Sequence, residues 1–232
     1  MSAPPDDVVH RIHDRYLVEV VEGLKLCPFA RKSREQGRVH RPVLRADGLN
    51  PTAHAAADVL IQTATQHADA EIVLLTFVGE DPRLATPATF DVLVREIRTI
   101  YDASDDAPRP FFMVGFHRDL GSFPEGEAPE LTRDTLVPLL RRTPDPVIQC
   151  VDATTLERVR RQAQRTAHER MVAEMTAVNP ALKAVAERSI CPDSELSADI
   201  ARANFESVAH GEGRAELERC LADIRRERDA QA

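Results

Sequence analysis

The sequence predicts an α/β fold, with a mainly parallel or mixed sheet of about four strands covered by helices and followed by a helical C-terminal extension. Two continuous apolar runs, at residues 72–78 and 111–116, are typical of buried strands. Segments with apolar side chains every three or four residues alternate with these runs and are typical of amphipathic helices. This alternation favours crossover connections and a sheet covered by helices.

The first third of the chain predicts two helices and two strands. Asp6 and Asp7 are candidate caps for a helix over residues 8–24, where apolar side chains recur in steps of three and four. A short strand is expected at residues 39–45, and Pro42 favours an edge or end position for it. An alanine-rich helix at 51–68 then leads to the strand at 72–78.

The middle of the chain predicts two more strands, each preceded by a helix. Thr86 followed by a proline starts one helix, which leads to a strand near residues 110–117. Thr132 caps the next helix, which leads to a strand near 146–151. We expect the strands at 72–78 and 110–117 to be central in the sheet and the 39–45 strand to lie near an edge.

The chain is divided by this pattern into an α/β core at residues 1–152 and a helical extension at 153–232. The first helix of the extension, near 154–177, has an apolar stripe that we expect to be buried. The extension either packs on the core or forms the arm of a homodimer, and the sequence leaves both open. The stripe consists of Leu156, Val159, Ala163, Ala167 and Met171.

Composition excludes several classes of protein. A 43% hydrophobic content suffices for a core, while a net charge of −8 and few aromatic residues argue against a nucleic-acid-binding surface. No apolar run approaches a membrane span, and residues 1–7 lack the pattern of a secretory signal. The four cysteines form no CxxC pair, so reduced thiols and a cytoplasmic location are expected.

Cys27 is the candidate nucleophile. Pro28 gives it an extended backbone, and Lys25 and Arg31 are cations that favour a thiolate. The end of the preceding helix disfavours an anion, and the neighbouring side chains are apolar. The alternative is therefore a packed, inert cysteine in the turn that ends the helix.

His117 and Arg142 are the other candidates for an active site. His117 follows a buried strand, and α/β folds gather ligands at strand ends. Arg142 beside Thr143 suits a carboxylate or a phosphate, and Arg31 and Arg38 extend the basic character of the loop after Cys27. The alternatives are a histidine bonded to its own loop and a solvated turn at a helix end.

Neither a metal nor a cofactor is predicted. His10 and His13 are three residues apart on a helix, but no further ligand lies at a recognised spacing, so surface histidines are expected. The sequence contains no GxxxxGK[ST], GxGxxG or GxSxG motif, which disfavours nucleotide-dependent enzymes and serine hydrolases.

Residues 23–30 (GLKLCPFA) differ only at Lys25 from a GLNLCPFA motif. Phe116 and His117 match the start of an FHP motif in which Arg118 replaces the proline. Residues 142–146 (RTPDP) match an RSPxP element, with Gln149 in place of a later histidine. With these motifs the chain resembles the bacterial family called domain of unknown function 1415, a resemblance that implies no particular reaction.

Two classes of function follow. One is a small-molecule enzyme, a hydrolase or transferase acting on an anionic metabolite, in which Arg142 binds the anion, His117 moves a proton and Cys27 lines the pocket or attacks. The other is a non-catalytic ligand-binding or protein-interaction module in which the same residues are structural. Convergence of Cys27, His117 and Arg142 on one pocket would favour the enzyme.

Overall fold

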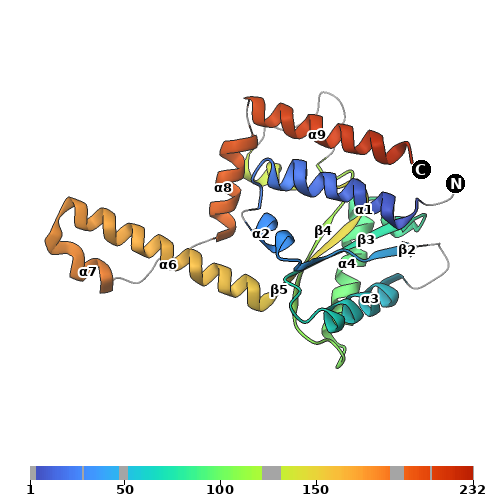
Figure 1. Ribbon diagram of the computed structural model, residues 1–232, viewed down its shortest axis with the longest axis horizontal. Coiled ribbons are helices and arrows are strands. Elements are labelled where there is room, and N and C mark those ends of the chain that lie inside the picture. The colour runs from blue at the N-terminus through green and yellow to red at the C-terminus, as the bar shows by residue number, and fades with distance from the viewer. Residues whose placement is uncertain are drawn as a thin grey trace.

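The computed structural model describes residues 4–27, 29–46, 52–121, 132–188, 196–209 and 211–231, and it shows a mixed α/β fold (Figure 1). The predicted fold class is confirmed, and the sheet is mixed. In the sheet, β3 and β5 are central, β1 and β2 pair in parallel with β3, and β4 pairs antiparallel with β5. The strands are β1 (Val39–His40), β2 (Val43–Ala46), β3 (Ile72–Gly79), β4 (Phe111–Phe116) and β5 (Val147–Asp152).

The predicted order of the strands was wrong at one place. The 72–78 run is central as expected, but β4 lies at an edge of the described sheet and β5 takes the second central place. A continuous apolar run does not fix the number of strands that pair with it. In β4, moreover, one face is left partly uncovered near its start. Phe112 of β4 is exposed on that account.

Pro42 interrupts the first predicted strand and separates β1 from β2. Proline has no N–H to donate to a ladder, but its carbonyl still accepts a hydrogen bond from the backbone N–H of Thr76 at 3.0 Å. Both short strands pair only with β3, so the predicted edge position is confirmed.

One face of the sheet is covered by α3 (Thr52–Gln66) and α4 (Pro87–Asp102). Thr86 caps α4 as predicted, in a reciprocal capping box with Thr89. The short helix η2 (Pro82–Leu84) connects β3 to α4. The largest buried side chains of this core come from both helices and from the sheet: Leu60, Leu75, Phe77, Phe90, Leu93, Ile97, Tyr101 and Ile148.

The opposite face is crossed by one continuous helix, made of α1 (Asp6–Arg15) and the π-helical segment η1 (Tyr16–Glu22). In η1 the backbone hydrogen bonds join each N–H to the carbonyl five residues earlier, as between the N–H of Gly23 and the carbonyl of Val18. The sequence predicted a helix here but not the π-helical turn. A short helix that it missed, α2 (Ala30–Glu35), follows.

A second core joins this helix to α5 (Arg133–Leu140), α8 (Leu196–Val208) and α9 (Gly211–Asp229). Thr132 caps α5 as predicted. In Figure 1, α9 runs alongside α1, so the first and last described helices of the chain are neighbours. The buried members are Ile12, Tyr16, Val20, Leu26, Leu136, Leu139, Val208, Leu217, Cys220 and Ile224.

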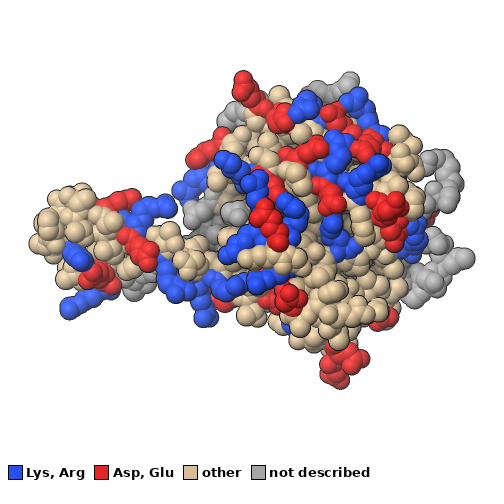
Figure 2. Space-filling view, viewed as in Figure 1, with Lys and Arg blue, Asp and Glu red and all other residues tan. Residues whose placement is uncertain are grey.

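The helix α6 (Ala153–Val178) projects from this body as an arm, on which η3 (Pro180–Leu182) and α7 (Lys183–Arg188) turn back (Figures 1 and 2). No residue of α6, which is described throughout, is buried. The apolar stripe predicted on α6 is only half-buried. The prediction that the core of this chain buries the stripe was therefore wrong, because α6 extends beyond the sheet. Burial against a partner and the division of the chain at residue 152 stay predictions.

Within the described ranges, no helix combines the length and the apolar character that crossing a membrane requires. In the view of Figure 2, acidic and basic side chains are interspersed over the body of the molecule. Pro28 and Cys191 lie outside the described residues.

Lys25 is the one described non-glycine residue with a positive φ, at 57°. This left-handed conformation lets the chain turn from η1 towards α2, and asparagine or glycine adopts it more readily than lysine. We expect Lys25→Gly to raise the free energy of unfolding by about 0.5–1 kcal/mol in urea denaturation. Lys32→Gly, within α2, should instead lower it by about 1 kcal/mol. A lower free energy of unfolding in both variants would contradict the prediction.

Candidate functional site

A cavity of about 90 Å³ lies between the α1–η1 helix and the sheet, on the face opposite α3 and α4. Apolar side chains form most of its surface, including Leu17 and Val21 of η1. Its polar lining comes from four regions of the chain: His10, His13 and Glu22; Cys27, Arg34 and Arg41; Thr76; and Thr143 and Gln149. We call it the helix–sheet cavity.

Two central strands form the floor of this cavity. Leu74 of β3 is paired with Gln149 of β5, and Thr76 with Val147, so all four side chains share one face. Over the described part of the chain, neither the amide of Gln149 nor the hydroxyl of Thr76 has a hydrogen-bond partner in a side chain or the backbone. The floor therefore presents polar groups to the cavity that the fold does not use.

His13 is buried in the wall of the cavity, in contrast to the surface histidine that the sequence predicted. It follows Val9 by one helical turn, which puts it on the buried face of α1. Its Nε2 donates to Oδ2 of Asp145 at 3.1 Å, and the same carboxylate accepts from Nε of Arg228 of α9 at 2.8 and 3.0 Å.

His10 also lines the cavity, and its Nε2 donates to the carbonyl of Arg41 at 2.9 Å. Arg41 extends from the break between β1 and β2, and one of its nitrogens pairs with Asp14. Each histidine thus uses one ring nitrogen to hold a second element. The signal missed in the sequence was their place on the apolar face of α1.

A buried carboxylate, Glu22, and Arg34 line the end of the cavity near α2. Glu22 has a side chain only 3% exposed and accepts two bonds from Arg34, at 2.6 and 3.0 Å, and one from Arg31 at 3.3 Å. The hydrogen bonds from Arg34, and then those from Arg31, lower the pKa of Glu22 against the opposing effect of burial. Glu22 is therefore an anion that Arg34 and Arg31 neutralise.

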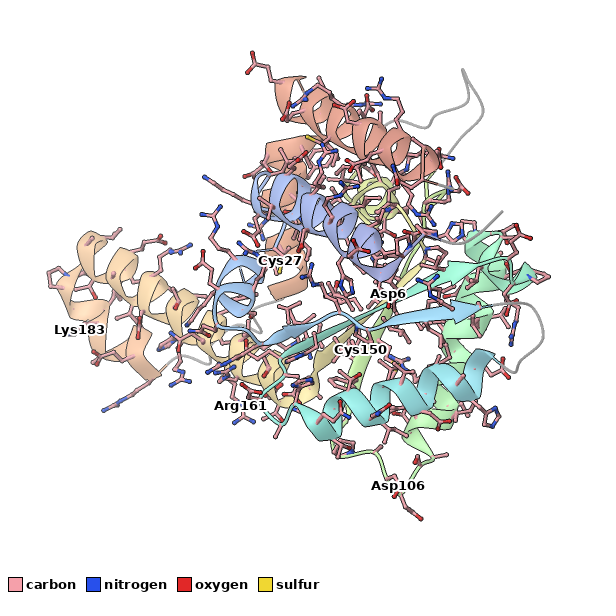
Figure 3. The ribbon with its side chains drawn as sticks, turned by 45° about the vertical axis from the view of Figure 1, so that its right-hand side comes forward. Asp6, Cys27, Asp106, Cys150, Arg161 and Lys183 are labelled. Carbon is pink, nitrogen blue, oxygen red and sulfur yellow. The ribbon has the colours of Figure 1, made fainter. Side chains whose placement is uncertain are left out.

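Cys27 lines the same cavity, between η1 and α2 (Figure 3). Burial raises the pKa of its thiol, and the backbone N–H groups of Phe29 and Ala30 only partly offset this. Lys25 and Arg31 do not act as its counterions: Arg31 pairs with Glu22 instead. The structure favours a neutral thiol.

We therefore expect slow alkylation of Cys27 by iodoacetamide in the native protein at about pH 7, because the thiolate is the reacting species. Peptide mass mapping over time would give the rate, with urea-denatured protein as the control in which all four cysteines react. Labelling of Cys27 as fast in the native as in the denatured protein would contradict a raised pKa.

His117 is buried away from this cavity. Its Nε2 donates to the carbonyl of Leu84 at 2.9 Å, and its Nδ1 accepts from the N–H of Asp119 at 3.1 Å. Both ring nitrogens are thus used by the backbone, and the ring ties the end of β4 to η2. The bond with Asp119 matches the alternative of a histidine bonded to its own loop, while the bond to Leu84 of η2 was not predicted.

The predicted arginines are dispersed. Arg38 pairs with Glu71 at 2.8 Å and Arg31 with Glu22, while Arg142 lines a second cavity, beside α9. Thr143 lies in the wall of both cavities and donates its hydroxyl to the carbonyl of Asp145. Neither of these two cavities therefore brings Cys27, His117 and Arg142 together.

No group of three or more potential metal ligands occurs among the residues whose positions are described. Comparisons of the chain with protein-family models, curated proteins and solved structures found no match. The fold and the site thus define a mixed α/β protein with a mainly apolar cavity between a helix and its sheet, and its function has to be argued from this cavity.

Proposed function

We propose that this protein binds a small organic anion in the helix–sheet cavity, with the apolar part of the molecule between η1 and the sheet. A largely apolar cavity with a few polar groups is the usual form of a small-molecule site. The proposal is one of binding, and it does not require a reaction.

The observation that carries it is the floor of the cavity, where Gln149 and Thr76 have unused hydrogen-bonding groups. These groups are accessible from the cavity, so a bound molecule can hydrogen-bond to them without displacing a bond within the protein. Apolar side chains at these two strand positions would leave the floor of the cavity without hydrogen-bonding groups.

The charge of the cavity wall supports an anion. Arg34 and Arg41 each line the cavity and each keep guanidinium N–H groups beyond those that pair with Glu22 and Asp14. The carboxylate of Glu22 is already neutralised by two arginines. A carboxylate or similar group on the ligand would therefore meet net positive charge.

The enzyme with Cys27, His117 and Arg142 in one active site loses support, because neither of the two cavities brings these side chains together and the thiol of Cys27 is disfavoured as an anion. A different enzyme remains as the second candidate. His13 held by the buried Asp145 has the arrangement of a proton-transferring histidine oriented by a carboxylate.

The binding proposal is tested with hexanoate and benzoate as probes, by isothermal titration calorimetry. Gln149→Leu and Arg41→Gln should each weaken binding about tenfold, the effect of losing a hydrogen bond to a charged ligand. Gln62→Leu, on the exposed side of α3, is the matched control and should leave the affinity unchanged. Hexylamine should not bind.

Failure of both carboxylates to bind at millimolar concentration, or equal weakening in Gln62→Leu, would refute the proposal. The second candidate is separated by adding 2-oxohexanoate in D2O and following its α-protons by NMR. Catalysed exchange that is lost in His13→Gln, with binding retained, would favour the proton-transfer enzyme. Binding without accelerated exchange would leave the protein as a binding module.

A further inference from the structure

We infer that the second cavity, beside α9, is a separate binding site for a phosphate group. It has a volume of about 180 Å³, and three arginines line it: Arg118 after β4, Arg142 before β5 and Arg225 of α9. The three come from separate elements, so the tertiary fold brings them together. This inference does not depend on the proposed ligand of the helix–sheet cavity.

Arg142 is the fixed member of this group. Its Nε donates to the carbonyl of Leu120 at 2.6 Å, and a second nitrogen donates to the carbonyl of Gly121. Within the described ranges it makes no ion pair, and its side chain is half-buried. Burial lowers the pKa of Arg142; the charge of Glu218 and, more weakly, that of Asp119 oppose this, while Arg225 adds to it.

The other two arginines can turn towards a ligand. Arg118 pairs with Asp229 at 2.9 Å, and Arg225 pairs with Asp119 at 3.3 Å and with Asp229 at 3.9 Å; these pairs are partly exposed. Exposed ion pairs contribute about 0–1 kcal/mol, so exchanging a carboxylate for a ligand costs little. Glu218 is the acidic residue of the lining, and Arg214 already pairs with it at 2.9 Å.

The arrangement suits phosphate better than a carboxylate. A tetrahedral dianion has acceptor oxygens in several directions, and guanidinium groups from three sides can each donate to it. A carboxylate presents only two oxygens in one plane. Leu221 and Ile224 line the remaining wall, which leaves an apolar side for the carbon part of a small phosphomonoester.

The test is titration calorimetry with inorganic phosphate, at constant ionic strength, on the full chain. Arg225→Gln and Arg118→Gln should each weaken phosphate binding about fivefold or more. Arg142→Gln should abolish it, but this variant can also disturb the turn at Leu120, so the other two variants decide the test. Arg226→Gln is the matched control, because Arg226 lies on the same helix with a side chain 78% exposed.

Saturable binding that is weakened by Arg118→Gln and Arg225→Gln but not by Arg226→Gln would support the site. Equal weakening by Arg226→Gln, no saturable binding, or succinate binding as tightly as phosphate would overturn it. Glycerol 3-phosphate binding more tightly than phosphate would identify a phosphomonoester site, and equal affinity a site for the free ion. Hexanoate binding should be unchanged in Arg225→Gln, which separates this result from that of the proposed function.

Discussion

Asp145→Ala is expected to lower the free energy of unfolding by about 3–5 kcal/mol, the usual cost of removing one partner from a buried ion pair. The carboxylate of Asp145 joins His13 of α1 to Arg228 of α9, and the side chains of Asp145 and Arg228 are only 8% and 11% exposed. Without Asp145, Arg228 would be a buried charge with no counterion. Urea denaturation followed by circular dichroism measures the difference.

Asp91→Ala is the control for this variant. Asp91 also pairs with an arginine, Arg95, but on the surface of α4, where both side chains are about 70% exposed. Such a pair contributes about 0–1 kcal/mol. A similar decrease in the free energy of unfolding in the two variants would mean that Asp145 does not act through a buried network of ion pairs.

Leu217→Ala in α9 should cost about 2–5 kcal/mol, because the side chain is fully buried in the second core and its loss leaves a cavity. Val178→Ala, at the end of the projecting α6, should change stability by less than about 0.5 kcal/mol, since its side chain is 84% exposed. Urea denaturation of both variants compares the two halves of the C-terminal region.

This pair of variants tests whether α9 is an integral part of the fold while α6 is an outlying arm. If Leu217→Ala cost no more than Val178→Ala, α9 would be a peripheral helix. If both substitutions lowered the free energy of unfolding by about 2–5 kcal/mol, the arm would be packed in solution, against the body or against another chain.

The sequence predicted the elements better than their arrangement. The run at 72–78 and the threonine caps at Thr86 and Thr132 are local signals, and each is found as expected. The order of strands is set by tertiary pairing, which no local pattern encodes, so β4 was placed centrally when it lies at an edge. Similarly, the stripe on α6 has helical periodicity whether or not anything covers it.

For the site, the sequence identified residues near cavities but grouped them wrongly in space. Cys27 and Thr143 line the helix–sheet cavity, and Arg142 lines the second one. His13 was expected at the surface, although its position on the apolar face of α1 was a signal of burial. The role of Gln149 depends on β5 lying beside β3, which only the folded sheet reveals.

The pairing of α1 with α9 has a consequence for protein synthesis. Arg15 forms an ion pair with Glu227, 212 residues further along the chain. At translation rates of about 5–20 residues per second, α1 leaves the ribosome about 10–40 s before its partner helix exists. The apolar stripe of α1 is uncovered during that interval, and a newly made chain therefore offers chaperones a binding segment until α9 is made.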